Sequence, residues 1–105
     1  MRFLVMAMNG PTAESAARML EYSKSLQKAG VLLARDELFP PSTGARISFT
    51  DGRPTVTNGP FVPSKELLGG YWILQVRSRE EAIEWAKRAP LSGDEAIEVL
   101  QIREM

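Results

Sequence analysis

The stretch that decides the fold is residues 71–86, which read YWILQVRSREEAIEWA. Its opening residues are apolar on both alternating faces, and this pattern predicts a strand that is covered on both sides. Ser78 follows, with Glu81 three residues later, and this spacing is typical of a capping box at the start of a helix. Small and apolar residues then recur at helical spacing: Ala82, Ile83, Ala86 and Ala89. The stretch therefore predicts a buried strand that leads directly into a helix.

The beginning of the chain shows the same order. Residues 3–8 are apolar on both alternating faces and predict a first strand. Thr12 is placed to cap the helix that follows, and Gly30 is a natural end for that helix. Residues 31–38 predict a second strand, which completes a first β-α-β unit.

A hairpin is expected between the two halves of the chain. Residues 45–50 and 54–57 flank Asp51-Gly52, a dipeptide that favours a tight two-residue turn. We also expect one helical turn at residues 64–68, just before the strand that begins at residue 71.

These elements predict an α+β domain over residues 1–105, with a ferredoxin-like split βαβ build and a β-hairpin insertion. The last strand is expected at residues 96–102. Two helices can cover only one face of such a sheet, yet the strands at residues 3–8 and 71–76 are apolar on both faces. A second copy of the chain is the economical cover, which predicts a homodimer. The alternative is that the hairpin and the loop fold over this face.

Composition limits the chemistry. The 105 residues include 13 basic and 13 acidic side chains, so the chain lacks the broad positive field of nucleic-acid-binding proteins, and nucleic acid is not an expected partner. The sequence contains no cysteine and no histidine, which excludes thiolate chemistry and the commonest metal ligand. We expect no metal and no cofactor. No apolar run approaches a membrane span, so we expect a cytoplasmic protein without a membrane partner.

A series of motifs runs along almost the whole chain. They are Gly30-Val31-Leu32-Leu33, Glu37-Leu38, Pro40-Pro41-Ser42-Thr43, Asp51-Gly52, Asn58-Gly59-Pro60-Phe61, Lys65-Glu66-Leu67-Leu68-Gly69-Gly70-Tyr71 and Ala82-Ile83-Glu84-Trp85-Ala86. In order and spacing this series resembles the YCII-related superfamily and, more narrowly, its DGPF subfamily. The resemblance implies a ferredoxin-like domain that pairs sheet face to sheet face, as a dimeric α+β barrel.

The resemblance implies less about activity. Most relatives have no established activity, and some resemble enzymes that act on small ring-derived compounds. The YCII-type relatives suggest a His–Asp pair as an active site, which cannot be present in a chain without histidine. Asn58 also stands where the subfamily's tetrapeptide begins with an aspartate. Both departures weigh against acid–base catalysis, and whether the chain is an enzyme stays open.

Glu37 is the candidate catalytic base. Asp36 and Glu37 are adjacent in the second predicted strand, so their side chains face opposite sides and only one can enter a shared pocket. Glu37 is the one that matches the family pattern. The structural alternative is a solvated charge or an ion pair with one of three cations: Arg35, Arg46 or Lys65.

The candidate ligand-binding residues are Arg46, Asn58, Gly59, Phe61, Lys65 and Tyr71. Asn58 offers both a donor and an acceptor, Phe61 offers an apolar wall, and Lys65 offers a positive charge. Each has a structural alternative. Turn formation accounts for residues 58–61, exposure accounts for Lys65, and core packing accounts for Tyr71.

Three functions are compatible with these residues. The favoured one is a dimeric module that binds a small organic molecule, aromatic or lactone-like, between the sheet and residues 58–61. The second is a lyase or hydrolase that acts on small ring-derived acids, with Glu37 as base. The third is a regulatory interaction domain linked to transcription, which the family resemblance alone implies.

Overall fold

The computed structural model describes residues 1–11, 15–59 and 67–104. In chain order the elements are β1 (Arg2–Met8), α1 (Ala16–Lys28), β2 (Leu32–Glu37), a 3-10 turn (Pro41–Thr43), β3 (Ala45–Thr50), β4 (Arg53–Asn58), β5 (Leu68–Gln75), α2 (Arg79–Lys87) and β6 (Ala96–Gln101). The predicted succession of two β-α-β halves separated by a hairpin is present in this order.

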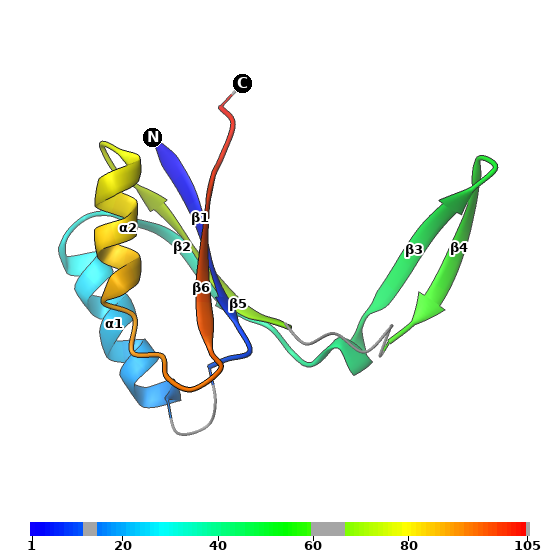
Figure 1. Cartoon of the computed structure of the whole chain (residues 1–105), viewed down its shortest axis with the longest axis horizontal. Coiled ribbons are helices and arrows are strands. Elements are labelled where there is room, and N and C mark those ends of the chain that lie inside the picture. The colour runs from blue at the N-terminus through cyan, green and yellow to red at the C-terminus, as the bar shows by residue number, and fades with distance from the viewer. Residues whose placement is uncertain (12–14, 60–66, 105) are drawn as a thin grey trace.

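The strands form two separate sheets. β2, β5, β1 and β6 make a four-stranded antiparallel sheet in that order, and β3 and β4 make a two-stranded sheet of their own. Both helices lie on one face of the larger sheet, and the β3–β4 hairpin stands on the other side (Figure 1). The predicted α+β class is therefore confirmed. We call the sheet face that the helices leave uncovered the open face.

The core lies between the larger sheet and the helices, because strand side chains alternate between the two faces. In β1, Phe3, Val5 and Ala7 are buried on the helix side, whereas Leu4 and Met6 are half-buried on the open face. Other buried residues, from the helices, from β5 and from positions next to strand ends, complete the core: Met19, Tyr22, Leu26, Val31, Trp72, Leu74, Val76, Ala82 and Ala86. The two-faced strands thus place one face in the core and leave the other outside it.

Trp72 lies where the helices pack against the sheet. It follows Tyr71 in β5 and therefore points to the opposite face, where it is buried. Its indole Nε1 donates a 2.9 Å hydrogen bond to Oγ of Ser23 in α1. The Tyr22 ring packs edge-on against it, with ring centroids 5.5 Å apart. The Tyr22 hydroxyl donates a 2.6 Å hydrogen bond to the Trp85 carbonyl of α2, so both helices are connected at this point.

α2 begins at the predicted cap. Oγ of Ser78 accepts a 3.1 Å hydrogen bond from the backbone N–H of Glu81. The Glu81 carboxylate in turn accepts a 3.3 Å hydrogen bond from the backbone N–H of Arg77, one residue before the cap. An N-cap of this kind stabilises a helix by about 1 kcal/mol.

The predicted helical turn at residues 64–68 differs from the structure at its C-terminal end. β5 begins at Leu68, so this residue belongs to a strand and not to a helical turn, and residues 64–66 of the predicted turn lie outside the described residues. The early start is possible because Gly69 has no side chain: a Cβ there would overlap the Gly10 carbonyl. Thr12, the predicted cap of α1, also lies outside the described residues.

The β3–β4 hairpin, residues 45–58, is called the arm from here on. It turns at Asp51 and Gly52, whose φ angles of 52° and 75° are those of the predicted tight turn. The arm projects from the larger sheet (Figure 1), and nearly all of its residues are exposed. The alternative expectation, that the hairpin covers the open face of its own chain, is therefore wrong for this structure.

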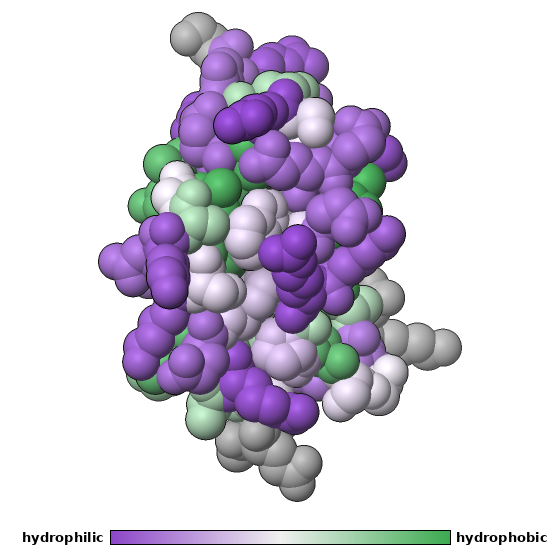
Figure 2. Space-filling view, turned by 90° about the vertical axis from the view of Figure 1, so that its left-hand side faces the viewer, coloured by the Kyte–Doolittle hydropathy of each residue, from purple (hydrophilic) through white to green (hydrophobic). Residues whose placement is uncertain are grey.

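The helix side of the molecule is polar. Figure 2 shows it as mainly hydrophilic, and exposed ion pairs such as Lys87–Glu84, at 3.0 Å, lie on it. Neither helix in the described part of the chain has the length and apolar character needed to cross a membrane.

Candidate functional site

The open face carries an apolar hollow. Its volume is about 330 Å³, and five residues of β1 and β5 line it: Leu4, Met6, Leu68, Tyr71 and Ile73. These side chains gather there because β1 and β5 are neighbours, with Leu4 opposite Ile73 and Met6 opposite Tyr71 in the register. The alternation that puts Trp72 into the core therefore puts Tyr71 and Ile73 into the hollow.

The polar group that lines the hollow is the Tyr71 hydroxyl, which is hydrogen-bonded to a neighbouring carboxylate. The Tyr71 hydroxyl donates a 2.6 Å hydrogen bond to Oδ2 of Asp36. The two residues are direct partners in the β2–β5 register, so the sheet itself fixes their approach. The hydrogen bond to the Asp36 carboxylate raises the pKa of Tyr71. The phenol therefore stays protonated well into the alkaline range, beside a carboxylate.

Glu37 lies apart from this pair. It follows Asp36 in β2 and so points to the other side of the strand. Its carboxylate is half-exposed and forms a 3.0 Å ion pair with Arg35, which is one of the structural alternatives that the sequence left open. Glu37 borders a second hollow of about 340 Å³ at the end of the sheet, together with Asn9, Gly10, Pro11, Leu38, Leu67 and Gly69.

The base of the arm holds two further predicted residues. Asn58 pairs with Ala45 at the end of β4 and is exposed. The backbone N–H of Gly59 donates a 2.9 Å hydrogen bond to the Gly44 carbonyl, and a Cβ on Gly59 would overlap the Pro41 carbonyl. Close backbone packing thus accounts for the glycine. Phe61 and Lys65 lie outside the described residues.

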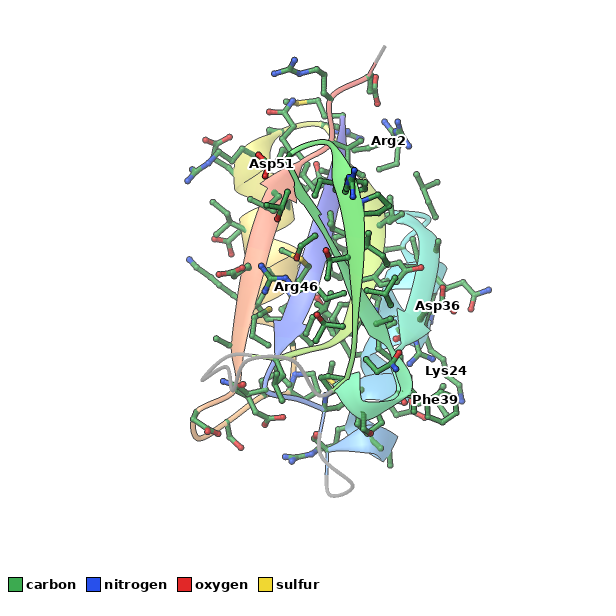
Figure 3. The ribbon with its side chains drawn as sticks, turned by 90° about the vertical axis from the view of Figure 1, so that its right-hand side faces the viewer. Arg2, Lys24, Asp36, Phe39, Arg46 and Asp51 are labelled. Atoms are coloured by element: carbon green, nitrogen blue, oxygen red, sulfur yellow. The ribbon has the colours of Figure 1, made fainter. Side chains whose placement is uncertain are left out.

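Arg46 is exposed on the arm. In Figure 3, which looks onto the open face with the arm in front, Arg46 and Asp36 lie on opposite sides of the arm. The predicted contacts are therefore divided within one protomer: Tyr71 is in the hollow, Glu37 is at the sheet end, and Arg46 and Asn58 are on the arm.

Most of the residues that line the hollow were not predicted from the sequence as ligand contacts. Leu4, Met6 and Ile73 were recognised as apolar strand residues but not as ligand contacts, and Asp36 was set aside for its neighbour. The signal that could have found them is the alternation in β1 and β5, since every second residue of a strand with one covered face lines the other face. No cluster of acidic side chains in the described residues is arranged to hold a metal ion.

Comparison with known proteins places the chain in a family. A family model described as the YCII-related domain matches residues 1–105. The chain belongs to the YCII-related family. No match was found among curated protein sequences.

Among solved structures, this YCII-related domain is similar to 5-chloro-2-hydroxyhydroquinone dehydrochlorinase (TftG) from Burkholderia phenoliruptrix AC1100, in complex with 2,5-dihydroxybenzoquinone. The TM-score is 0.54 at 18% sequence identity, and the match covers 93% of this chain and 91% of TftG. At this identity the similarity establishes a shared fold.

Proposed function

We propose that this YCII-related domain binds a small hydroxylated ring compound in the hollow of its open face. The observation that carries the proposal is the Tyr71–Asp36 hydrogen bond at the edge of an otherwise apolar hollow. Ligand sites of small molecules combine apolar walls with a few placed polar groups in the same way. The site differs from the sequence expectation, because Asn58 lies at the base of the arm and not beside the hollow.

The volume of the hollow limits the size of the ligand. A volume of about 330 Å³ is at the lower end for small-molecule sites, which suits a single ring with short substituents. Leu4, Met6 and Ile73 would contact the ring, and the Met6 thioether is well suited to an aromatic face.

The Tyr71–Asp36 pair limits which substituents a ring ligand can carry. The Tyr71 proton is committed to Asp36, so the phenol oxygen and the carboxylate offer acceptors to a ligand. A ligand hydroxyl can donate to these acceptors, whereas a ligand carboxylate would meet the negative charge of Asp36. We therefore expect a neutral phenol, hydroquinone or hydroxylactone to bind better than an aromatic acid. The quinone named with TftG is a single ring that carries two hydroxyl groups.

A matched pair of ligands tests this proposal. Hydroquinone and 4-hydroxybenzoate differ in one carboxylate, so thermal unfolding is measured with each. Hydroquinone is expected to raise the Tm, and a concentration of ten times Kd adds about 1.4 kcal/mol to the free energy of unfolding. 4-Hydroxybenzoate is expected to have a smaller effect on the wild type and a restored effect on Asp36→Asn. No stabilisation by either ligand, or equal stabilisation of the wild type and Tyr71→Phe, would contradict the site.

A second candidate function is proton abstraction from a ring hydroxyl, for which Asp36 is better placed than Glu37. Asp36 stands beside the hollow, and Glu37 is paired with Arg35 on the other side of the strand. Once turnover of a ring substrate is detected, Asp36→Asn should abolish it and Glu37→Gln should preserve it. The opposite result would favour Glu37 as the base.

We also propose that the domain, as a single unit over residues 1–105, is a homodimer of ferredoxin-like build. Counted along the chain, the strands of the larger sheet stand in the order second, third, first, fourth, which supports a split βαβ topology. The uncovered apolar residues of the open face support a partner copy. The DGPF motif series supports placement in that subfamily. Light scattering of the purified protein tests the assembly, since a mass of one chain would contradict it.

A further inference from the structure

We propose that the arm of each protomer crosses to a second copy of the chain and closes the hollow of that copy. The inference deepens the proposed function, because it makes the ligand site a product of two chains. It rests on the hollow as the ligand site, but not on the identity of the ligand.

The arm has one apolar face. Residues directly opposite each other in an antiparallel pair lie on the same face. Ile47 is opposite Val56, and Phe49 is opposite Pro54. Ile47, Phe49 and Val56 are 49%, 76% and 62% exposed. The other face is polar and carries Arg46, Ser48, Thr50, Arg53, Thr55 and Thr57. An arm that stayed in solvent would have no reason to segregate its apolar side chains on one face.

The arm also lacks support from its own chain. Within the described residues, β3 and β4 pack extensively only on each other. A two-stranded hairpin by itself is at best marginally stable in water. The arm therefore needs an apolar surface that its own protomer, in this arrangement, does not provide.

The open face is such a surface. Besides the hollow, it exposes Leu100 of β6, which is 54% exposed and lies opposite Leu4. The strands of the arm have six residues each, which gives a length of about 20 Å at about 3.3 Å per residue. β1, with seven residues, is of similar length. The apolar face of the arm can therefore cover the hollow along most of the sheet.

The two arginines of the arm lie on its other face. Arg46 and Arg53 belong to the polar face, so they point to solvent when the apolar face of the arm covers the sheet. Covering the hollow in this way therefore buries neither positive charge.

We expect the arm to bind a second copy of the chain, because each chain contains both an arm and an open face. The arm and the open face lie on the same side of the molecule (Figure 1). A two-fold rotation can therefore place each arm on the other chain's sheet, so that one contact is made twice. Phe49 of the second copy would then form the outer wall of the hollow, where a ring ligand could stack against it.

A pair of arm variants tests the crossing. Phe49→Asp places a charge on the apolar face of the arm, and Ser48→Asp places the same charge on the polar face one residue away. Both sites lie outside the core, so the fold should survive, which circular dichroism checks. We expect Phe49→Asp to raise the dimer dissociation constant at least about tenfold, measured by light scattering against concentration, and Ser48→Asp to behave as the wild type. Equal dimerisation of the two variants would overturn the proposal.

Cysteine pairing distinguishes crossing from folding back. The chain has no cysteine, so introduced thiols have no competitors. Phe49→Cys and Ile73→Cys proteins are mixed and oxidised. Crossing predicts a covalent heterodimer of twice the chain mass. An arm that folds onto its own sheet predicts instead that a chain carrying both substitutions closes an internal disulfide and stays at the mass of one chain.

The outcomes for the arm and for the ligand are separable. Loss of the dimer in Phe49→Asp, without hydroquinone binding by any form, would support the crossing and contradict the proposed ligand. Hydroquinone binding by a wild-type monomer would support the ligand site and overturn the crossing. If both proposals hold, Phe49→Asp should lose dimerisation and hydroquinone affinity together.

Discussion

The hydroxyl of Tyr71 donates a 2.6 Å hydrogen bond to Oδ2 of Asp36, its direct partner across the β2–β5 register. This contact joins the two strands at the point where the apolar hollow of the open face becomes polar. It also supplies the polar groups of the proposed ligand site, since the remaining lining residues are apolar.

The first prediction concerns the titration of Tyr71. Because the hydrogen bond to Asp36 raises the pKa of Tyr71, Asp36→Asn should let this phenol ionise at lower pH than in the wild type. The ultraviolet absorbance of the phenolate, followed against pH, measures this. The chain has two tyrosines, so a Tyr22→Phe background leaves Tyr71 as the one that titrates. An unchanged titration curve in Asp36→Asn would show that the hydrogen bond is absent in solution.

The second prediction concerns alkaline stability. Burial raises the pKa of Tyr22 from 10.0 to about 12. In the unfolded chain the phenol ionises near 10.0, whereas in the folded chain it stays neutral. The stability contributed by the neutral phenol is therefore present below pH 10.0 and is lost as the pH rises toward about 12.

Urea unfolding at increasing pH tests this sign. The free energy of unfolding of the wild type should fall more steeply than that of Tyr22→Phe between pH 10.0 and about 12. Parallel curves for the two proteins would indicate that Tyr22 is not held neutral by the fold.

The sequence was sufficient for the features that depend on local patterns. The alternation at residues 3–8 gave the two-faced strand, Asp51-Gly52 gave the turn of the arm, and the spacing of Ser78 and Glu81 gave the cap of α2. Each depends on residues that are near one another in the chain, where propensity and periodicity act.

The sequence was insufficient for features that depend on the register between strands that are distant in the chain. Asp36 and Tyr71 are 35 residues apart, and only the pairing of β2 with β5 makes them neighbours. A strand can be shifted by one residue without altering its local pattern, and such a shift would bring Glu37 to the open face in place of Asp36. Glu37 was chosen as the base because it matches the family pattern, and the sequence alone could not show that the register places Asp36 on the open face instead. The position of the arm relative to the sheet likewise has no local signal.

The third prediction concerns the buried indole of Trp72. Ser23→Ala would leave its Nε1 without the acceptor that now lies at 2.9 Å, and a buried donor without a partner costs about 1–3 kcal/mol. Ser25→Ala is the matched control, because Ser25 is also in α1 and, like Ser23, donates to a carbonyl of that helix, but it is exposed and the indole donates to Ser23 instead. Chemical denaturation should show the larger loss for Ser23→Ala. Equal losses would contradict the role of the indole contact.

The fourth prediction concerns the two glycines of β5. A Cβ on Gly69 would overlap the backbone carbonyl of Gly10, whereas one on Gly70 would lie 3.0 Å from the carbonyl oxygen of Asp36. Gly69→Ala therefore requires a backbone shift and should cost more than about 2 kcal/mol of unfolding free energy, whereas Gly70→Ala should cost less. The midpoints of urea unfolding compare the two variants. A larger loss for Gly70→Ala would show that the backbone near Gly10 yields more easily than its packing indicates.

The most direct test of the ligand site is the response of the methionine methyl groups to hydroquinone, followed by NMR. Met6 lines the hollow, whereas Met19 is buried in the core on the other side of the sheet and serves as an internal control. The proposed site predicts that the Met6 methyl signal shifts progressively with hydroquinone, through the ring current of a bound aromatic, while the Met19 signal stays in place. A Met6 signal that does not move at saturating hydroquinone, or a shift confined to the other methionines, would contradict the hollow as the binding site.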